Sequence, residues 1–130
     1  MFSHDDILLP LALTVIIDTR VREPELAEMC HQATDMLELF GCEPLSQDDI
    51  WAWFNDNRHT IQNALKSPRK NTYILRILTK FSDDMHVENL YDAMVSISIA
   101  DQEYHQEESQ LVQSAAALWG YERPPLKVRR

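Results

Sequence analysis

Apolar residues recur through most of this chain every three or four positions, which is the spacing of one face of an α-helix. The clearest stripe predicts a helix from about Pro24 to Gly41, because proline is favoured in a first turn and glycine after a last turn. Its apolar members are Leu26, Met29, Cys30, Ala33, Leu37 and Phe40. No pair of segments alternates in the manner of a β-hairpin. The pattern therefore favours an all-α protein.

Five further segments predict helices on either side of this stripe. Four of them cover about 5–17, 72–81, 87–100 and 106–119. The fifth begins after an N-cap at 46 and ends at a break over 66–71. Ser46 is followed by two acids in the next turn, where the helix dipole favours negative charge. Pro10 lies inside the first segment, which indicates a kink or a late helix start. The segment 82–89 has the composition of another capped start.

Length and composition agree with a helical domain. The chain has 130 residues, 45% of them apolar and only two of them glycine, which suits helices better than a turn-rich sheet protein. We expect one domain over 1–122, with an apolar core. Residues 123–130 form a basic, proline-containing tail, and we expect it to be flexible. The predicted fold is a compact bundle of about six to seven helices.

One apolar segment raises the question of a membrane. Ile7 to Ile17 is about half of the ~20 residues that a membrane span needs, and the residues before it lack the Lys or Arg flank of a signal peptide. We expect a buried first helix in a soluble protein. Cys30 and Cys42 form no disulfide framework or zinc-ligand pair. They favour reduced thiols in a cytoplasmic protein.

Charge is distributed unevenly. The net charge of −9 argues against nucleic acid or an anionic membrane as partner of the whole surface. Residues 57–82 nevertheless contain no acid and all the bases of a predicted basic flank, which are Arg58, Lys66, Arg69, Lys70, Arg76 and Lys80. A basic face of this kind is usually only solvated. The functional alternative is a docking surface for an acidic partner protein, or for the acidic face of another copy.

The chain also partly repeats itself at a shift of 83 residues. Asp18 then aligns with Asp101, and Glu25 aligns with Glu108. Each Asp closes a predicted apolar helix, and each Glu opens the next one. The second helices end alike, in LFGCEPL over 39–45 and in LWGYERPPL over 118–126. Two helix–loop–helix units related by an internal pseudo-twofold are therefore predicted, on either side of a helical middle.

The repeated acids suggest chemistry. An Asp at a helix C-terminus faces the negative end of the dipole, so something positive should offset it. If the two junctions meet, four carboxylates form one cluster, and a bound cation is a common remedy for their repulsion. Carboxylates suit calcium or magnesium, and His105 could shift the preference towards zinc. The structural alternative is that these acids stabilise helix ends and pair with Arg20, Arg22 or solvent. The junctions are too short for an EF-hand.

At these junctions the sequence resembles the TerB-like family, the helical domains of tellurite resistance and stress response. ADQEYHQEE, over 100–108, and IDTRVREPE, over 17–25, resemble the family's doubled A-D-G-x-x-x-x-x-E pattern. The family's glycine is replaced here by Gln102 and Thr19. The resemblance implies an all-α, cytoplasmic and bacterial stress-response domain. It also implies a divalent-metal or partner site at Asp18, Glu25, Asp101 and Glu108, and it supplies no reaction.

Two functions follow. The first is a non-enzymatic, TerB-like domain that binds a divalent cation at its doubled acidic junction. The second is a metal-free interaction scaffold that uses the acidic junction or the basic flank, through a protein partner or self-association. No catalytic Ser/His/Asp or Cys/His set and no Gly-rich phosphate loop appears in the sequence. Trp51 and Trp53 cannot both face the same way on one helix, so one joins the core and the other packs on a second helix or on a partner.

Overall fold

The computed structural model of the protein describes residues 2–17, 21–100 and 106–120, and these form six helices joined by short connections. The helices are α1 (His4–Ile16), α2 (Glu23–Leu39), α3 (Gln47–Lys66), α4 (Lys70–Leu78), α5 (Asp84–Ser98) and α6 (Gln106–Trp119). No strand occurs in the described part of the chain. The predicted all-α bundle is confirmed.

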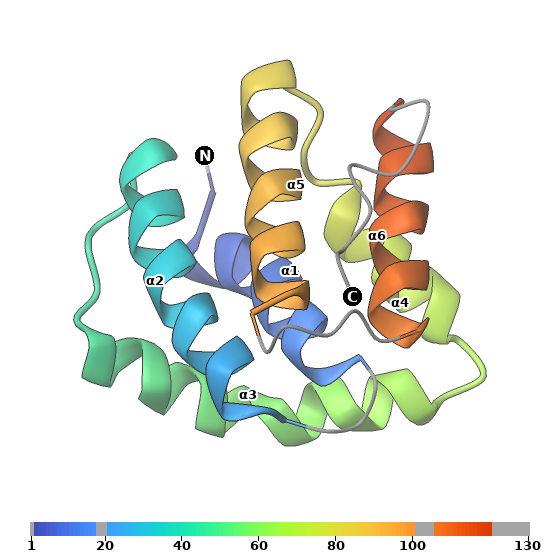
Figure 1. The fold of residues 1–130 in the computed structure, drawn as a ribbon, viewed down its shortest axis with the longest axis horizontal. Helices are drawn as coiled ribbons and strands as arrows, with labels where there is room; N and C mark the ends of the chain where they lie inside the picture. The colour runs from blue at the N-terminus through green and yellow to red at the C-terminus, as the bar shows by residue number, and fades with distance from the viewer. Residues whose placement is uncertain (1, 18–20, 101–105, 121–130) are drawn as a thin grey trace.

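The apolar helix α1 forms the centre of the bundle (Figure 1). It packs against α2, α3, α4 and α5, while α5 also contacts α2 and α6. In the view of Figure 1, α3 runs across the lower edge of the molecule. Every residue of α1 from Leu11 to Ile16 is buried, so the expectation of a buried first helix is confirmed. None of the described helices is long and apolar enough to cross a membrane.

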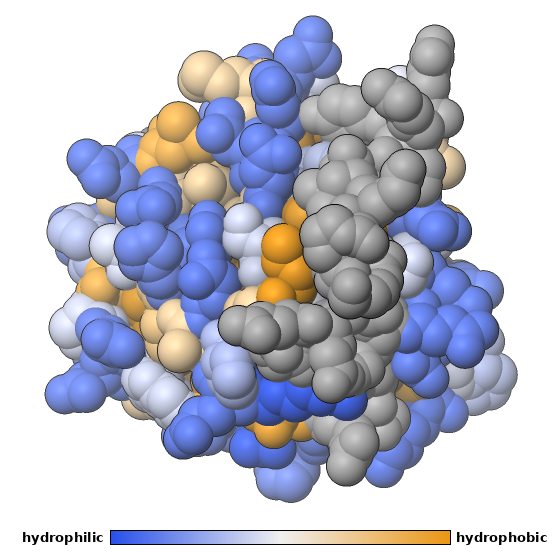
Figure 2. Space-filling view, in the orientation of Figure 1, coloured by the Kyte–Doolittle hydropathy of each residue, from blue (hydrophilic) through white to orange (hydrophobic). Residues whose placement is uncertain are grey.

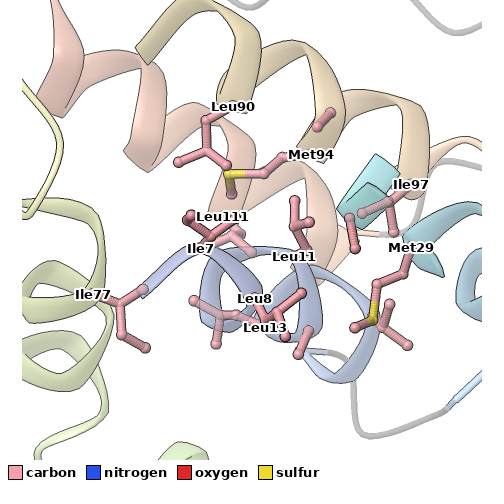
Figure 3. Packing of buried hydrophobic residues seen from close by; sticks show 14 of the residues in the cluster. Ile7, Leu8, Leu11, Leu13, Met29, Ile77, Leu90, Met94, Ile97 and Leu111 are labelled. Carbon is pink, nitrogen blue, oxygen red and sulfur yellow. The ribbon is translucent and has the colours of Figure 1, made fainter. Parts of the chain in front are cut away.

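Side chains from α1 and four other helices pack together in the core. Figure 3 shows Ile7, Leu8, Leu11 and Leu13 of α1 with Met29 of α2, Ile77 of α4, Leu90, Met94 and Ile97 of α5, and Leu111 of α6. Burying a side chain of this size contributes about 1.5–3 kcal/mol. The shared apolar core therefore fixes how the helices sit around α1, and with them the ends that carry the candidate residues.

Three helices begin at caps that local sequence chemistry explains. The Ser3 hydroxyl accepts from the Asp6 N–H, and the Asp6 carboxylate accepts from the Ser3 N–H in return. Ser46 forms the same capping box at the start of α3, as its N-cap prediction requires. The Asp83 carboxylate caps α5 by accepting two backbone N–H groups. The capped start expected within 82–89 is confirmed.

Gly41 follows the end of α2 and forms a left-handed turn. Gly41 has a φ of 74°, its N–H donates to the Glu38 carbonyl, and the next N–H donates to the Leu37 carbonyl. This pair of hydrogen bonds is a Schellman motif. Gly120 follows α6 with a φ of 89°. Both helix ends that looked alike in the sequence thus place glycine at positive φ.

Some expected boundaries were wrong. Of the two alternatives at Pro10, the late start does not occur: α1 begins at His4, one residue before the expected start at about residue 5, and stays helical through the proline. Helix α5 begins three residues before the expected Val87, since Asp83 supplies the cap. Helix α4 runs over Lys70–Leu78 rather than 72–81. The bounds predicted for α6 agree with the structure.

Aromatic side chains pack against one another near the start of α1, the end of α2 and the start of α5. Phe2 stacks on Phe81 with ring centroids 5.0 Å apart, and Phe40 stacks on His86 at 4.2 Å. Trp51 and Trp53 both pack against the core and are partly buried. Both tryptophans therefore pack on the bundle, which agrees with the interpretation in which another helix contacts the second of them.

Candidate functional site

Two glutamates singled out by the repeat are fully buried. Glu25 lies in the first turn of α2 and Glu108 in the first turn of α6, and each is 0% exposed. Their neighbours Glu23 and Glu107 occupy the same first turns and are exposed. Glu107 is therefore a surface charge. The first turn alone does not explain the burial of Glu25 and Glu108, because a first-turn acid interacts with the helix dipole equally well at the surface.

The surroundings of Glu25 include a base from its own turn. Arg22 Nη1 lies 3.9 Å from Glu25 Oε1, and the Arg22 side chain is itself only 18% exposed. Arg22 is also the residue before α2 and supplies no side-chain cap. This ion pair matches one part of the structural alternative, in which a junction acid pairs with Arg22. It is spaced i,i+3 and lies within one junction.

The remaining predicted ligands fall outside the described residues. Asp18, Asp101 and His105 lie in the segments 18–20 and 101–105. Among the residues that are described, no group of three or more His, Cys, Asp or Glu side chains gathers closely enough to hold a metal ion. The four-carboxylate site and the extra His105 ligand therefore remain predictions.

The helix ends that flank the two junctions lie at the same end of the bundle. In Figure 1, α1 and α5 end, and α2 and α6 begin, towards the lower part of the molecule. Ile17, the last described residue before Asp18, lines one groove with Glu107, which precedes Glu108. The first junction thus approaches the start of α6. The burial of an acid at both places and the two glycine-terminated helices agree with an internal repeat.

The packing is less symmetric than the repeat would require. Helix α2 packs along α5, whereas the equivalent pair, α1 with α6, makes no comparable helix–helix contact in the described chain. The pseudo-twofold relation of the two units therefore stays a prediction. The tail 123–130 lies outside the described residues, so its expected flexibility stays a prediction as well.

The predicted basic flank runs along α3, the α3–α4 turn and α4. Lys66, Arg69 and Arg76 are exposed, while Lys70 is half-buried at the first position of α4. The other two bases interact within the protein. The Arg58 guanidinium lies over the Phe54 ring at 5.6 Å, and Lys80 Nζ lies 3.4 Å from Asp6 Oδ1. The exposed part of the flank is centred on the α3–α4 turn.

A groove beside this turn was not expected from the sequence. It has a volume of about 370 Å³ and lies between the end of α1, α4 and the first half of α6. Ile17, Ile74, Leu75 and Leu111 form its apolar part, and Lys70 and Glu107 carry its charges. These residues come from three distant segments, so no local pattern in the sequence could have grouped them. Figure 2 shows the hydropathy of the face viewed in Figure 1, where apolar residues occur as separate patches among hydrophilic ones.

The cysteines and histidines form no site in the described chain. Cys30 is buried and Cys42 is half-buried, and both are free thiols, as expected. Burial raises the pKa of the Cys30 thiol, which opposes its reactivity. Cys42 Sγ lies 3.4 Å from the Phe2 carbonyl oxygen, to which it donates. His31 is exposed on α2.

Comparisons with protein-family models, with curated proteins and with solved structures give no match for this chain.

Proposed function

We propose that this protein is a non-enzymatic helical domain of the TerB-like type, which binds a divalent cation where its two helix–loop–helix junctions meet. The observation that carries the proposal is the full burial of Glu25 and Glu108, 83 residues apart, each in the first turn of a second helix. On this proposal the ligands are Asp18, Glu25, Asp101 and Glu108, and His105 is an additional ligand. The protein acts in a cytoplasmic, bacterial stress response of the tellurite-resistance kind.

Burial of an ionised carboxylate carries a desolvation cost. Moving an ionised carboxylate out of water costs several kcal/mol unless hydrogen bonds and positive charge compensate it. The N-terminal dipole of α2 or α6 supplies part of this compensation. Arg22, whose Nη1 lies 3.9 Å from Glu25 Oε1, supplies a further part, and on this proposal the two buried carboxylates also share positive charge from a bound ion. A divalent cation supplies it, and four carboxylates are a ligand set suited to calcium or magnesium.

The experiment is a thermal melt of chelator-treated protein, with and without millimolar calcium, magnesium or zinc. One of these ions should raise Tm, because a ligand that binds only the folded state stabilises it, by about 2.7 kcal/mol at one hundred times Kd. Asp18→Asn combined with Asp101→Asn should abolish the rise. The absence of any ion-dependent shift in the unmodified protein would overturn the proposal.

The exposed part of the basic flank favours a second function, that of a metal-free interaction scaffold. Lys66, Arg69 and Arg76 are exposed on a protein that is acidic elsewhere. This function predicts that a polyglutamate peptide binds the protein in chelator, and that salt weakens the binding. Lys66→Glu with Arg69→Glu should remove the binding. Lys80 is a poorer choice for this variant, because its reversal also breaks the ion pair with Asp6.

A further inference from the structure

Among the described residues three large apolar side chains stay exposed: Leu118 of α6, at 37%, and two that are more exposed and lie on α4 and α5. Leu75 of α4 is 46% exposed and Met85 of α5 is 54% exposed. A single exposed apolar side chain is ordinary on a protein surface. Leu75 and Met85 differ from the ordinary case in their charged surroundings. Bases cluster around the start of α4, with Glu107 also lining the groove, and acids follow Met85 along α5.

Leu75 belongs to the basic side. It lines the groove of about 370 Å³ together with Ile74 and Leu111. Lys70 lines the same groove at the first position of α4. Lys66 at the end of α3 and Arg69 in the turn before α4 lie close to it in sequence, and both are exposed. An apolar groove that Lys70 lines, with two further exposed bases just before α4, fits an apolar side chain that is surrounded by acids.

Met85 provides such a surface. It lies in the first turn of α5, next to Asp84. Asp84, Glu88 and Asp92 follow one another every four residues, and all three are exposed, so they form one acidic stripe along the helix. Partial desolvation and the Glu88 charge raise the pKa of Asp92. Glu88 and Asp92 therefore repel one another, and facing bases would relieve the repulsion.

We propose that the α4–α6 groove binds a second copy of this chain, with Met85 against Leu75 and the acidic stripe of α5 facing Lys66, Arg69 and Lys70. This inference gives the partner of the scaffold function and does not depend on the cation site. In Figure 1, α5 begins at the upper edge of the molecule, whereas α4 and α6 begin at the lower right. The contact therefore joins different surfaces of two copies, and it generates a ring or a chain unless two copies exchange it reciprocally.

One groove residue opposes this contact. Glu107 lines the groove from α6 and is exposed, so it repels the incoming acidic stripe. The proposal therefore predicts that Glu107→Gln tightens the self-association. A purely apolar contact between copies would leave the affinity unchanged by this substitution.

The experiment is sedimentation velocity over a concentration series, in chelator and at low salt. We expect the unmodified protein to associate, and Lys70→Glu or Glu88→Lys to weaken the association about tenfold or more. Thr34→Glu is the control for the first variant, because Thr34 is exposed on α2 and does not line the groove, and the substitution also makes the protein more negative. Glu38→Lys, exposed on α2, is the control for the second. Both controls should associate as the unmodified protein does.

The most decisive measurement uses a mixture of the two variants. Lys70→Glu and Glu88→Lys, each weakened alone, should associate when mixed, because the new charges are complementary across the contact. Restoration also shows that both variants are folded. A protein that stays monomeric at millimolar concentration overturns the inference, as does a mixture that stays monomeric. If polyglutamate still binds that monomer through Lys66 and Arg69, the scaffold function stands while the second copy as partner is excluded.

Discussion

Glu107 and Glu108 are neighbours in the first turn of α6, yet the first side chain is exposed and the second is fully buried. Both interact with the same helix dipole, so they form a natural pair for comparison. Glu108→Gln should remove most of the stabilisation that a divalent cation gives to the protein. Glu107→Gln should keep that stabilisation and change the free energy of unfolding by less than about 0.5 kcal/mol. Urea unfolding with and without the ion measures both effects.

A hydrogen bond between α3 and α1 gives a second prediction. The Trp53 indole N–H donates to Asp5 Oδ1 at 2.8 Å. Trp53→Phe keeps most of the ring packing and removes the donor, so it should lower the free energy of unfolding by about 1–2 kcal/mol. A double-mutant cycle with Asp5→Ala should give a coupling of about 0.5–1.5 kcal/mol. Additive effects in the cycle would mean that the hydrogen bond is not formed in solution.

The acidic stripe of α5 predicts a pH dependence. Asp92 has a raised pKa in the folded protein, because burial and the Glu88 charge disfavour its ionised form. An ionised group of this kind costs stability above its folded pKa, and the cost disappears below the unfolded pKa of about 3.9. Asp92→Asn should therefore raise Tm at neutral pH, and the gain should vanish near about pH 3.

The control for this prediction is Glu88→Gln, which should lower the pKa of Asp92 in an NMR titration. An Asp92→Asn gain that is the same at acidic and neutral pH would show that charge is not its cause.

The turn after α2 predicts the effect of a backbone change. Gly41 has a positive φ, and a Cβ added there would meet no atom within 4 Å. Gly41→Ala should therefore cost about 1 kcal/mol from backbone conformation alone. Thermal or urea unfolding measures this cost. Gly41→Asn should cost less, since asparagine tolerates the left-handed region better than alanine, and an equal cost for both variants would contradict the explanation.

Local chemistry made much of the fold predictable. Ser46 was expected to cap α3 and does so with Asp49, because a cap depends on residues within one turn. Helix α4 begins two residues before its expected start, at Lys70, and it has no side-chain cap to mark that start in the sequence. Helix α5 was expected to begin at its first buried apolar residue, although Asp83 marks the true start.

The candidate site was predictable only in part. The repeat distinguished Glu108 from Glu107, because Glu25 matches the first of these and nothing acidic matches the second. The burial of Glu25 and Glu108 could not be read from the sequence, since it depends on how distant helices pack around α1. The groove of Ile17, Leu75 and Leu111 escaped prediction for the same reason.

Calorimetric titration of chelator-treated protein with calcium, magnesium and zinc tests the central claim most directly. The matched pair is Glu25→Gln with Glu108→Gln, both buried, against Glu23→Gln with Glu107→Gln, both exposed in the same first turns. The cation account predicts saturable binding of at least one ion to the unmodified protein and to the exposed pair, and its loss in the buried pair. Equal binding by both double variants, or no binding of any of the three ions to the unmodified protein, would contradict it.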